Sequence, residues 1–321
     1  ANPHQWLTEY EADYALRSIK YLQRSLDAGF TSVRDLGSSY KVIFPLKRAV
    51  ERGDIQGPRI FAAGDTITPT GGHADLHGYR KDISDVISGG LGVCDGADDC
   101  RRAVREVIKS GADVIKITAT GGVLSNTAAG VNQQFTDQEL MAIVDTAHNL
   151  GRSVTAHAHG TSGIKAALRA GVDSIEHGSY LDEETADLFV ATGAYYVPTL
   201  IAGYTVQRIA TERPGFFTPE VAQKALEVGP IMQNALRIAY SNGVKIAFGT
   251  DAGVNDHGTN AYEMVLMRDA GMPERAILIS ATVNAADLMD ISEITGTIEA
   301  GKDADIISVD SNPLEDIAAL L

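Results

Sequence analysis

Apolar residues follow two different spacings along this chain. In short runs they occupy every second position or every position, which is typical of strands, and in longer runs they recur every third or fourth position, which is typical of helices. Seven strands are predicted at 31–37, 58–64, 153–160, 173–180, 194–200 and 245–253 and around Lys116. Helices are predicted at 8–28, 42–52, 98–110, 136–150, 162–170, 182–192, 218–241, 259–270 and 274–289.

The predicted strands and helices alternate almost from end to end, without a linker or a shift in composition. Repeated strand–helix units imply a parallel sheet. A doubly wound nucleotide-binding fold would carry G-x-G-x-x-G after its first strand, whereas this chain reads DLGSSYKV there. We therefore predict an α/β fold, specifically a (β/α)8 TIM-like barrel with one strand missing, and expect the active site at the carboxyl ends of the strands.

Composition narrows the classes of function. The 321 residues are 44% hydrophobic and 21% charged, as in a globular protein. The net charge of −15 argues against a nucleic-acid partner, and no apolar run approaches the roughly 18 residues of a membrane span. A small-molecule substrate is therefore expected. The two cysteines, Cys94 and Cys100, leave both a disulfide and a pair of free thiols open.

Lys116 is out of place in a strand that otherwise looks buried. By strict alternation it shares a face with Val114 and Thr118, while Ile115 and Ile117 face the other side. A lysine in this position either extends its ammonium to water or, if buried, must lose its charge, find a partner or be chemically converted. Its role therefore depends on the rest of the chain.

Three other predicted strands end in residues that can bind metal. His157 alone could be an ordinary core histidine, but His159 lies two residues further on the same face. His177 and Asp251 each precede a glycine, where the backbone can approach a ligand closely. Imidazole nitrogens together with a carboxylate suit zinc or a related divalent ion.

These residues lie in motifs that extend over nearly the whole chain. The motifs are ADVIKITATGG, VTAHAHG, SIEHGSYLDEET and FGTDAG, with GHADLHG, HGTNAYEM, ISATVNAA and GTIEAGKDADIISVDSNPL. The set resembles the amidohydrolase superfamily, most closely its imidazolonepropionase-like branch, which includes Xaa-Pro dipeptidases and carboxypeptidases that act on dipeptides. The resemblance implies hydrolysis of the amide bond next to a C-terminal residue in dipeptides or N-acyl amino acids. We also expect a homo-oligomer.

The resemblance also implies a binuclear metal site. In this family the corresponding lysine is carboxylated by CO2, so Lys116 would become a carbamate that bridges two divalent ions, expected to be zinc. His157 and His177 would bind one ion, while Asp251 would bind the other and transfer protons during catalysis. Substrate contacts are expected from His73, His159, His257 and Tyr262.

One departure from the family concerns the first metal. The family's first strand ends in His-x-His, whereas here His4 stands alone and His73 and His77 lie in a loop at 64–97. We therefore expect the chain to be a piece of a longer protein whose first barrel strand lies elsewhere. A cytoplasmic location is favoured, and an N-terminal leader remains possible. The barrel is expected at 1–290, and 291–321 resembles a fragment of a small β-sandwich.

Two other functions remain possible at this stage. A cyclic-amide hydrolase of the imidazolonepropionase type would use one metal and no carboxylated Lys116, and an inactive barrel that serves as a binding protein would hold none. The long loop at 64–97 favours a substrate with a free carboxylate, because His73, His77 and Arg80 can donate hydrogen bonds to it. Arg34 and Asp35 could form an ion pair at the rim.

Overall fold

The structure is a computed structural model that describes residues 8–77, 79–80, 82–84, 92–124 and 130–321. The strands are β1 (Ser32–Asp35), β2 (Arg59–Ala62), β3 (Val114–Thr118), β4 (Ser153–Ala158), β5 (Ser174–His177), β6 (Tyr195–Val197) and β7 (Lys245–Ile246). The helices are α1 (Glu11–Asp27), α2 (Tyr40–Glu51), α4 (Ala97–Ser110), α5 (Asp137–Asn149), α6 (Thr161–Ala170), α7 (Glu183–Thr192), α8 (Leu200–Glu212), α9 (Pro219–Ser241), α10 (Tyr262–Asp269), α11 (Glu274–Ala281) and α12 (Val283–Leu288), with a 3-10 helix η2 (Ile317–Leu320).

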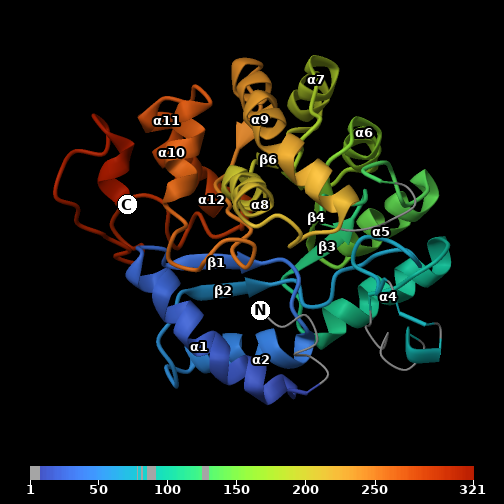
Figure 1. Cartoon of the computed structure of the whole chain (residues 1–321). Coiled ribbons are helices and arrows are strands. Elements are labelled where there is room, and N and C mark those ends of the chain that lie inside the picture. Colours follow the sequence, from blue (N-terminus) through green and yellow to red (C-terminus); the bar gives the residue numbers. More distant parts are fainter. Residues whose placement is uncertain (1–7, 78, 81, 85–91, 125–129) are drawn as a thin grey trace.

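All strand pairs are parallel and form two sheets. One contains β1 and β2, and the other has the order β3-β4-β5-β6-β7. Ile67, just after β2, joins the two, because its N–H donates to the Lys116 carbonyl at 2.8 Å and its carbonyl accepts the Thr118 N–H at 3.0 Å. The strands lie at the centre, with α4 to α7 and α9 outside the larger sheet and α1 and α2 outside the smaller one (Figure 1). The α/β fold with parallel strands is thus confirmed.

The strand register places Lys116 two residues before the level of His157, on the same face of the strands. Lys116 pairs with Thr155, and His157 pairs with Glu176. Alternation would turn His177 away from this face, but its φ of 73° lies in the left-handed region and redirects its side chain towards His157. The opposite face of the strands carries fully buried apolar residues that pack under the helices: Ile115, Ile117, Val154 and Ile175.

Helix α8 was not expected from the hydrophobic pattern. Its sequence contains Gly203 and several β-branched residues, which weaken the helical signal. Packing explains the helix, because a Cβ at Gly203 would lie 2.6 Å from the Met232 sulfur on α9. The helix predicted at 274–289 also differs, since it is divided into α11 and α12 at Thr282, whose φ of −122° and ψ of −84° leave the helical range.

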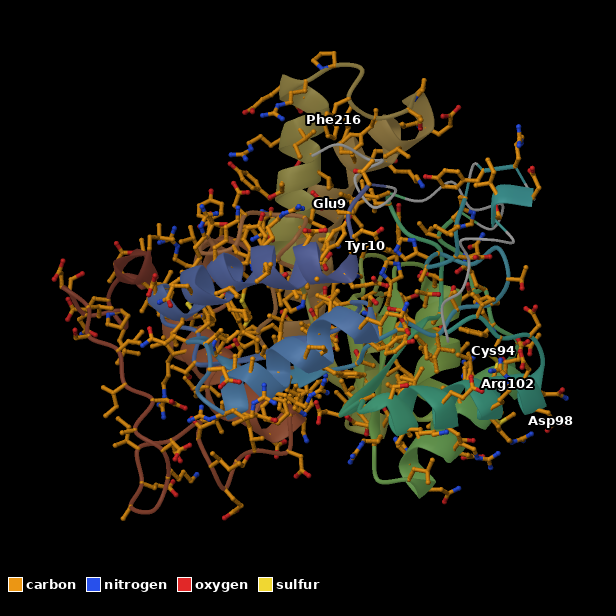
Figure 2. All side chains as sticks on the ribbon, turned by 90° about the horizontal axis from the view of Figure 1, so that it is seen from below. Glu9, Tyr10, Cys94, Asp98, Arg102 and Phe216 are labelled. Carbon is orange, nitrogen blue, oxygen red and sulfur yellow. A yellow bond between two sulfur atoms is a disulfide. The ribbon has the colours of Figure 1, made fainter. Side chains whose placement is uncertain are left out.

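The structure pairs Cys94 with Cys100 in a disulfide, which resolves the two possibilities for these cysteines. Cys94 lies beside α4, close to its Asp98 and Arg102, at an outer edge of the molecule (Figure 2). The bond therefore joins the end of the long loop to the start of a helix. His4 and parts of that loop (78, 81 and 85–91) are outside the described residues.

The segment 291–321 lies beside α10 and α11 at the edge of the molecule (Figure 1) and contains no strand among the described residues. Arg59 binds it through Asp303 at 2.7 Å and Asp305 at 2.8 Å. Several of its apolar side chains are exposed, including Ile298 at 91% and Ile306 at 68%. The division at residue 290 and the β-sandwich fragment stay predictions. No helix of the described residues has the length and hydropathy needed to cross a membrane.

Candidate active site

Three histidines converge at the carboxyl ends of β4 and β5. His157, His159 and His177 are buried, and each offers a ring nitrogen within 4.8 Å of those of the other two. The ring centroids of His157 and His177 are 4.7 Å apart, and those of His159 and His177 are 5.0 Å apart. The structure therefore places His159, which was expected only to line the pocket, as close to the cluster as the two predicted ligands.

His73 covers this cluster from the long loop. Its ring stacks on His157 with centroids 4.2 Å apart, and its backbone N–H donates to Gln134 Oε1 at 2.9 Å. Two buried ring nitrogens, His73 Nδ1 and His157 Nε2, have no hydrogen-bond partner within the described part of the chain. Buried polar atoms are rarely left unpaired, so the orphaned nitrogen of His157 fits a site for a cation.

The other two histidines are anchored through Nδ1. His159 Nδ1 lies 2.7 Å from Ser179 Oγ, and His177 Nδ1 lies 2.7 Å from Thr199 Oγ1. When Nδ1 is occupied in this way, Nε2 is the nitrogen left to bind a ligand. Ser179 and Thr199 were not singled out in the sequence, because neither belongs to a motif that by itself indicates chemistry.

Burial keeps these histidines neutral. It lowers the pKa of His73 to about 4 and that of His159 to about 3, and it lowers the pKa values of His157 and His177 well below their ordinary range. Neighbouring positive charges, including Lys116, lower these pKa values further. The rings therefore keep their lone pairs available for a metal at neutral pH.

Lys116 is buried beside the cluster, with 7% of its surface exposed. Burial lowers the pKa of its ammonium, although the carboxylates of Glu176 and Asp251 oppose this effect. The structure therefore excludes the alternative in which Lys116 extends into water. Its ammonium therefore loses a proton more readily than that of an exposed lysine.

Asp251 follows β7 and also has a left-handed backbone, with φ of 52°. The residue is exposed and so lies on the open side of the site, yet the surrounding protein displaces water and raises the pKa of its carboxyl group. The charge of Lys116 opposes this rise, and that of Glu176 adds to it. The carboxyl group of Asp251 can therefore hold a proton more readily than an ordinary aspartate.

A network of polar side chains lies next to Lys116 within the sheet. Arg34 donates to Glu176 Oε1 at 2.8 Å, and Thr155 donates to the same oxygen at 2.7 Å. Ser174 donates to Thr155 at 2.8 Å. Arg34 on β1 of the smaller sheet therefore pairs with Glu176 on β5 of the larger sheet and not with Asp35, whose carboxylate accepts a hydrogen bond from Ser38 at 2.8 Å. The interpretation of Arg34 and Asp35 as an ion pair is wrong.

The remaining predicted substrate residues lie in other surroundings. His257 stacks on Tyr21 of α1, with ring centroids 5.0 Å apart. Tyr262 lies next to Tyr204, with centroids 5.3 Å apart, and lines a cavity of about 1480 Å³ between α8, α10 and the C-terminal segment. A role for His257 and Tyr262 in substrate binding stays a prediction.

The loop at 64–97 brings only one of its three predicted donors to the cluster. His77 Nε2 lies 2.7 Å from the Gly72 carbonyl in its own loop, and Arg80 is exposed and pairs with Asp82 at 2.9 Å. His73 alone reaches the cluster, through its stacking on His157.

A cation from α9 lies beside His73. Lys224 Nζ donates to the Gly122 carbonyl at 3.0 Å, and a Cβ at Gly122 would meet the His73 ring at 2.3 Å, so the ammonium is held next to that ring. Its charge lowers the pKa values of His73 and His159. Sequence reasoning missed Lys224, because a single lysine in a long helix gives no signal until tertiary structure places it.

Comparison with known proteins agrees with this geometry. The model of the amidohydrolase family matches residues 2–321. A Xaa-Pro dipeptidase crystallised with methionine in its active site superposes with a TM-score of 0.90 at 46% identity, over 95% of this chain and 75% of that one. A prolidase in complex with N-methylphosphonate-L-proline superposes with a TM-score of 0.88 at 35% identity, over 100% of this chain and 78% of that one.

A curated relative of known activity is the ochratoxinase of Aspergillus niger. It is 33% identical over 328 residues, which cover 97% of this chain. The match spans 66% of the length of the ochratoxinase, slightly less than two thirds. Its crystal structure superposes with a TM-score of 0.86 over 100% of this chain and 75% of that one.

Proposed function

The chain belongs to the amidohydrolase family, and from this premise we propose that it is a metal-dependent hydrolase of amide bonds. The proposed substrates are dipeptides or N-acyl amino acids, cleaved next to the C-terminal residue. The observation that carries the proposal is the buried group of neutral histidines, with an unpartnered His157 Nε2, beside a buried Lys116. The names of the relatives, a Xaa-Pro dipeptidase, a prolidase and an ochratoxinase, support it.

The donor set suits two divalent ions. Imidazole nitrogens and a carboxylate are ligands that zinc accepts readily, and His157, His177, Lys116 and Asp251 are the residues that would hold the pair. When bound, such ions supply an activated hydroxide and polarise the carbonyl group of the substrate.

Lys116 would contribute as a carbamate. Burial lowers the pKa of its ammonium, so the neutral amine forms more readily than in an exposed lysine. The nitrogen of that amine can form a bond to the carbon of CO2 while the displaced proton leaves to solvent. The product places two oxygens that share one negative charge where the chain otherwise has an amine. This accounts for a lysine among the buried residues of β3.

Asp251 would move the proton. Its carboxylate accepts a proton from the attacking water and passes it to the nitrogen of the leaving amine, which is a poor leaving group until it is protonated. The raised pKa of Asp251 helps the carboxyl group to hold the proton between these two steps. Its place on the open side of the site gives it access to the substrate.

Recognition of a free carboxylate on the substrate is assigned to Lys224, with His73 beside it. An ammonium that is partly removed from water attracts a carboxylate more strongly than an exposed one does. Lys224 is half-buried and lies against the backbone that supports His73, so a carboxylate bound there would lie next to the histidine cluster.

The fold proposal extends the observed strand order. The succession β1-β2, Ile67 and β3 to β7 supports a (β/α)8 barrel. His157 and His177 lie at the carboxyl ends of β4 and β5, where barrel active sites are found, Asp251 follows β7, and Lys116 lies within β3. Closure of the barrel by a further strand, together with a homo-oligomeric state, belongs to the proposal.

A second function is favoured by one observation. Because His159 lies within 4.8 Å of both other histidines, three imidazoles alone could hold a single ion, as in a one-metal cyclic-amide hydrolase that has no need of a modified Lys116. The metal content of purified protein distinguishes the two, since about two ions per chain are expected for the first and about one for the second.

The substrate proposal is tested by comparing a dipeptide with its C-terminal amide on zinc-loaded protein treated with bicarbonate. Wild type should favour the acid, and Lys224→Met should raise KM for the acid while leaving the amide unchanged. Lys109→Met, an exposed lysine on α4, is the matched control and should behave as wild type. Equal rates on acid and amide by wild type would contradict the proposal.

A further inference from the structure

The hydrogen bond between His177 Nδ1 and Thr199 Oγ1, at 2.7 Å, joins a candidate metal ligand on β5 to the start of α8. Both groups are buried, with 8% of His177 and 2% of Thr199 exposed. A neutral imidazole carries its proton on one nitrogen only, so the partner of Nδ1 decides whether Nε2 is free to bind a metal.

The backbone of Thr199 is unusual. With φ of 50° and ψ of 43° it lies in the left-handed region, where a β-branched residue is a rare outlier. A glycine or asparagine would adopt this conformation with less strain. An outlier of this kind at a site points to a functional reason for the side chain, and the contact of the Thr199 hydroxyl with His177 provides one.

The start of α8 is fixed by a buried carboxylate from another helix. Glu263 of α10 is fully buried, and its two oxygens accept the N–H groups of Leu200 at 2.8 Å and Ile201 at 2.6 Å. These are the first two residues of α8, immediately after Thr199. Thr199 therefore cannot shift without breaking hydrogen bonds that would leave a buried carboxylate unsatisfied.

The main chain of His177 is held from the same side. The Tyr196 hydroxyl on β6 donates to the His177 carbonyl at 2.9 Å, and the Tyr196 ring lies so close to Gly178 that a Cβ there would meet it at 2.5 Å. The end of β6 and the start of α8 thus constrain both the backbone and the ring of His177.

We propose that Thr199 is a positioning residue that sets the tautomer of His177. Its hydroxyl oxygen accepts the Nδ1 proton, which turns the Nε2 lone pair towards His157 and His159, and Glu263 holds the backbone that makes this possible. The expected effect on zinc affinity rests on the proposed metal-dependent function. The tautomer itself is a property of the metal-free protein.

The first measurement is the tautomer of His177 in metal-free protein labelled with ¹⁵N-histidine. Long-range ¹H–¹⁵N correlation at pH 8 distinguishes protonation at Nδ1 from protonation at Nε2, and comparison with His177→Gln identifies the signal among the eight histidines. Wild type and Thr199→Ser, which keeps a hydroxyl, should show the Nδ1–H form. Thr199→Val, which keeps the shape but loses the acceptor, should show a mixture or the Nε2–H form.

The second measurement is zinc affinity by competition with a chelating dye. Thr199→Val should bind zinc roughly 10–100-fold more weakly than wild type, as is typical when the hydrogen-bond partner of a ligand is lost, and Thr199→Ser should restore the affinity. Thr205→Val, the same substitution at a buried threonine within α8, is the control and should bind as wild type. Thermal unfolding confirms that each variant is folded.

Two outcomes would overturn the inference. One is a wild-type protein with the Nε2–H form of His177. The other is a folded Thr199→Val variant with the wild-type tautomer and zinc affinity. Failure of the proposed function gives a different result. If wild type, Thr199→Ser and Thr199→Val show the expected tautomers but wild type binds no zinc, the metal site is contradicted and the positioning role is supported.

Discussion

The two ends of the larger sheet differ in whether their polar side chains have partners. At the carboxyl ends of the strands, His157 Nε2 is buried without a hydrogen-bond partner among the described residues, and Lys116 is buried with a lowered pKa. At the amino ends, Asp113 pairs with Lys47 at 2.6 Å and Asp173 with His148 at 2.9 Å. The carboxyl end thus holds a buried ring nitrogen that has no hydrogen-bond partner among the described residues, whereas the carboxylates at the amino end are paired.

The same contrast holds for the backbone. Asp113 also accepts the Ala62 N–H at 2.9 Å, and Asp173 accepts the Val154 N–H at 2.7 Å, so these carboxylates bind one segment to the next. At the carboxyl ends His177, Thr199 and Asp251 instead have left-handed backbones, which lower stability by roughly 1–3 kcal/mol each. This difference is the one expected if the carboxyl ends carry the proposed active site and the amino ends serve stability, as in barrel enzymes.

The largest expected effect is at the carboxyl end. Lys116→Ala should abolish amide hydrolysis and metal loading together, because the variant lacks the amine that would become the bridging carbamate. Activity on a dipeptide and metal content per chain are the measurements. A variant that retains two ions and near-normal activity would show that Lys116 is only a buried structural residue.

Asp251→Asn should have the next largest effect. The amide keeps the shape of the side chain but cannot accept a proton, so kcat should fall by roughly 10²–10⁴-fold, while KM changes less. Steady-state kinetics on zinc-loaded protein measure both quantities. Wild-type turnover in this variant would remove Asp251 from the proton transfer.

Acid should destabilise the metal-free protein through the histidines of the carboxyl end. The pKa of His73 is lowered to about 4 in the folded protein, so only the unfolded chain gains a proton at this residue between pH 6.5 and 4. The free energy of unfolding therefore falls as the pH is lowered through this range, by at most about 3 kcal/mol for His73. Urea unfolding at several pH values measures this free energy, which should fall less steeply with decreasing pH in His73→Gln than in wild type. Equal dependence of the unfolding free energy on pH in the two proteins would contradict this assignment.

The smallest effect on function is expected at the amino end. Asp113→Ala should lower the free energy of unfolding by about 1–3 kcal/mol, because the Ala62 N–H and the Lys47 ammonium lose their partner. Its kcat/KM on a dipeptide should equal that of wild type. A large loss of activity in a folded variant would contradict the expectation that the amino end contributes to stability alone.

Most of the fold was predictable from hydrophobic spacing. All seven strands are present where predicted, although β7 ends at Ile246, seven residues before its predicted end, and the amphipathic helices α4, α5 and α9 match their predicted positions to within a few residues. Helix α8 was not predictable, because its glycine favours non-helical structure and only contact with Met232 on α9 makes that glycine advantageous. The course of the segment after residue 291 was not predictable either, because the contact that holds it, Arg59 with Asp303 and Asp305, joins residues far apart in the sequence.

The candidate site was predictable where function leaves polar residues in apolar strands. Lys116, His157 and His177 have this signature, and the structure brings the two histidines together next to the lysine. Thr199 and Lys224 have no such signature, since a threonine just before a helix and a lysine within one are both ordinary. Their significance comes from one hydrogen bond each, to a histidine and to the backbone beside a histidine.

The anchoring of α8 by Glu263 has a consequence for the order in which the protein matures. The contacts among β3, β4 and β5 join neighbouring parts of the chain and can form early during synthesis. Glu263 is made 86 residues after His177, so a ribosome must extend the chain well past Asp251 before the Thr199 contact is fixed. If folding follows synthesis, the three histidines meet before the Thr199 contact is fixed, and the proposed metal site would reach its full affinity only as a late step of folding.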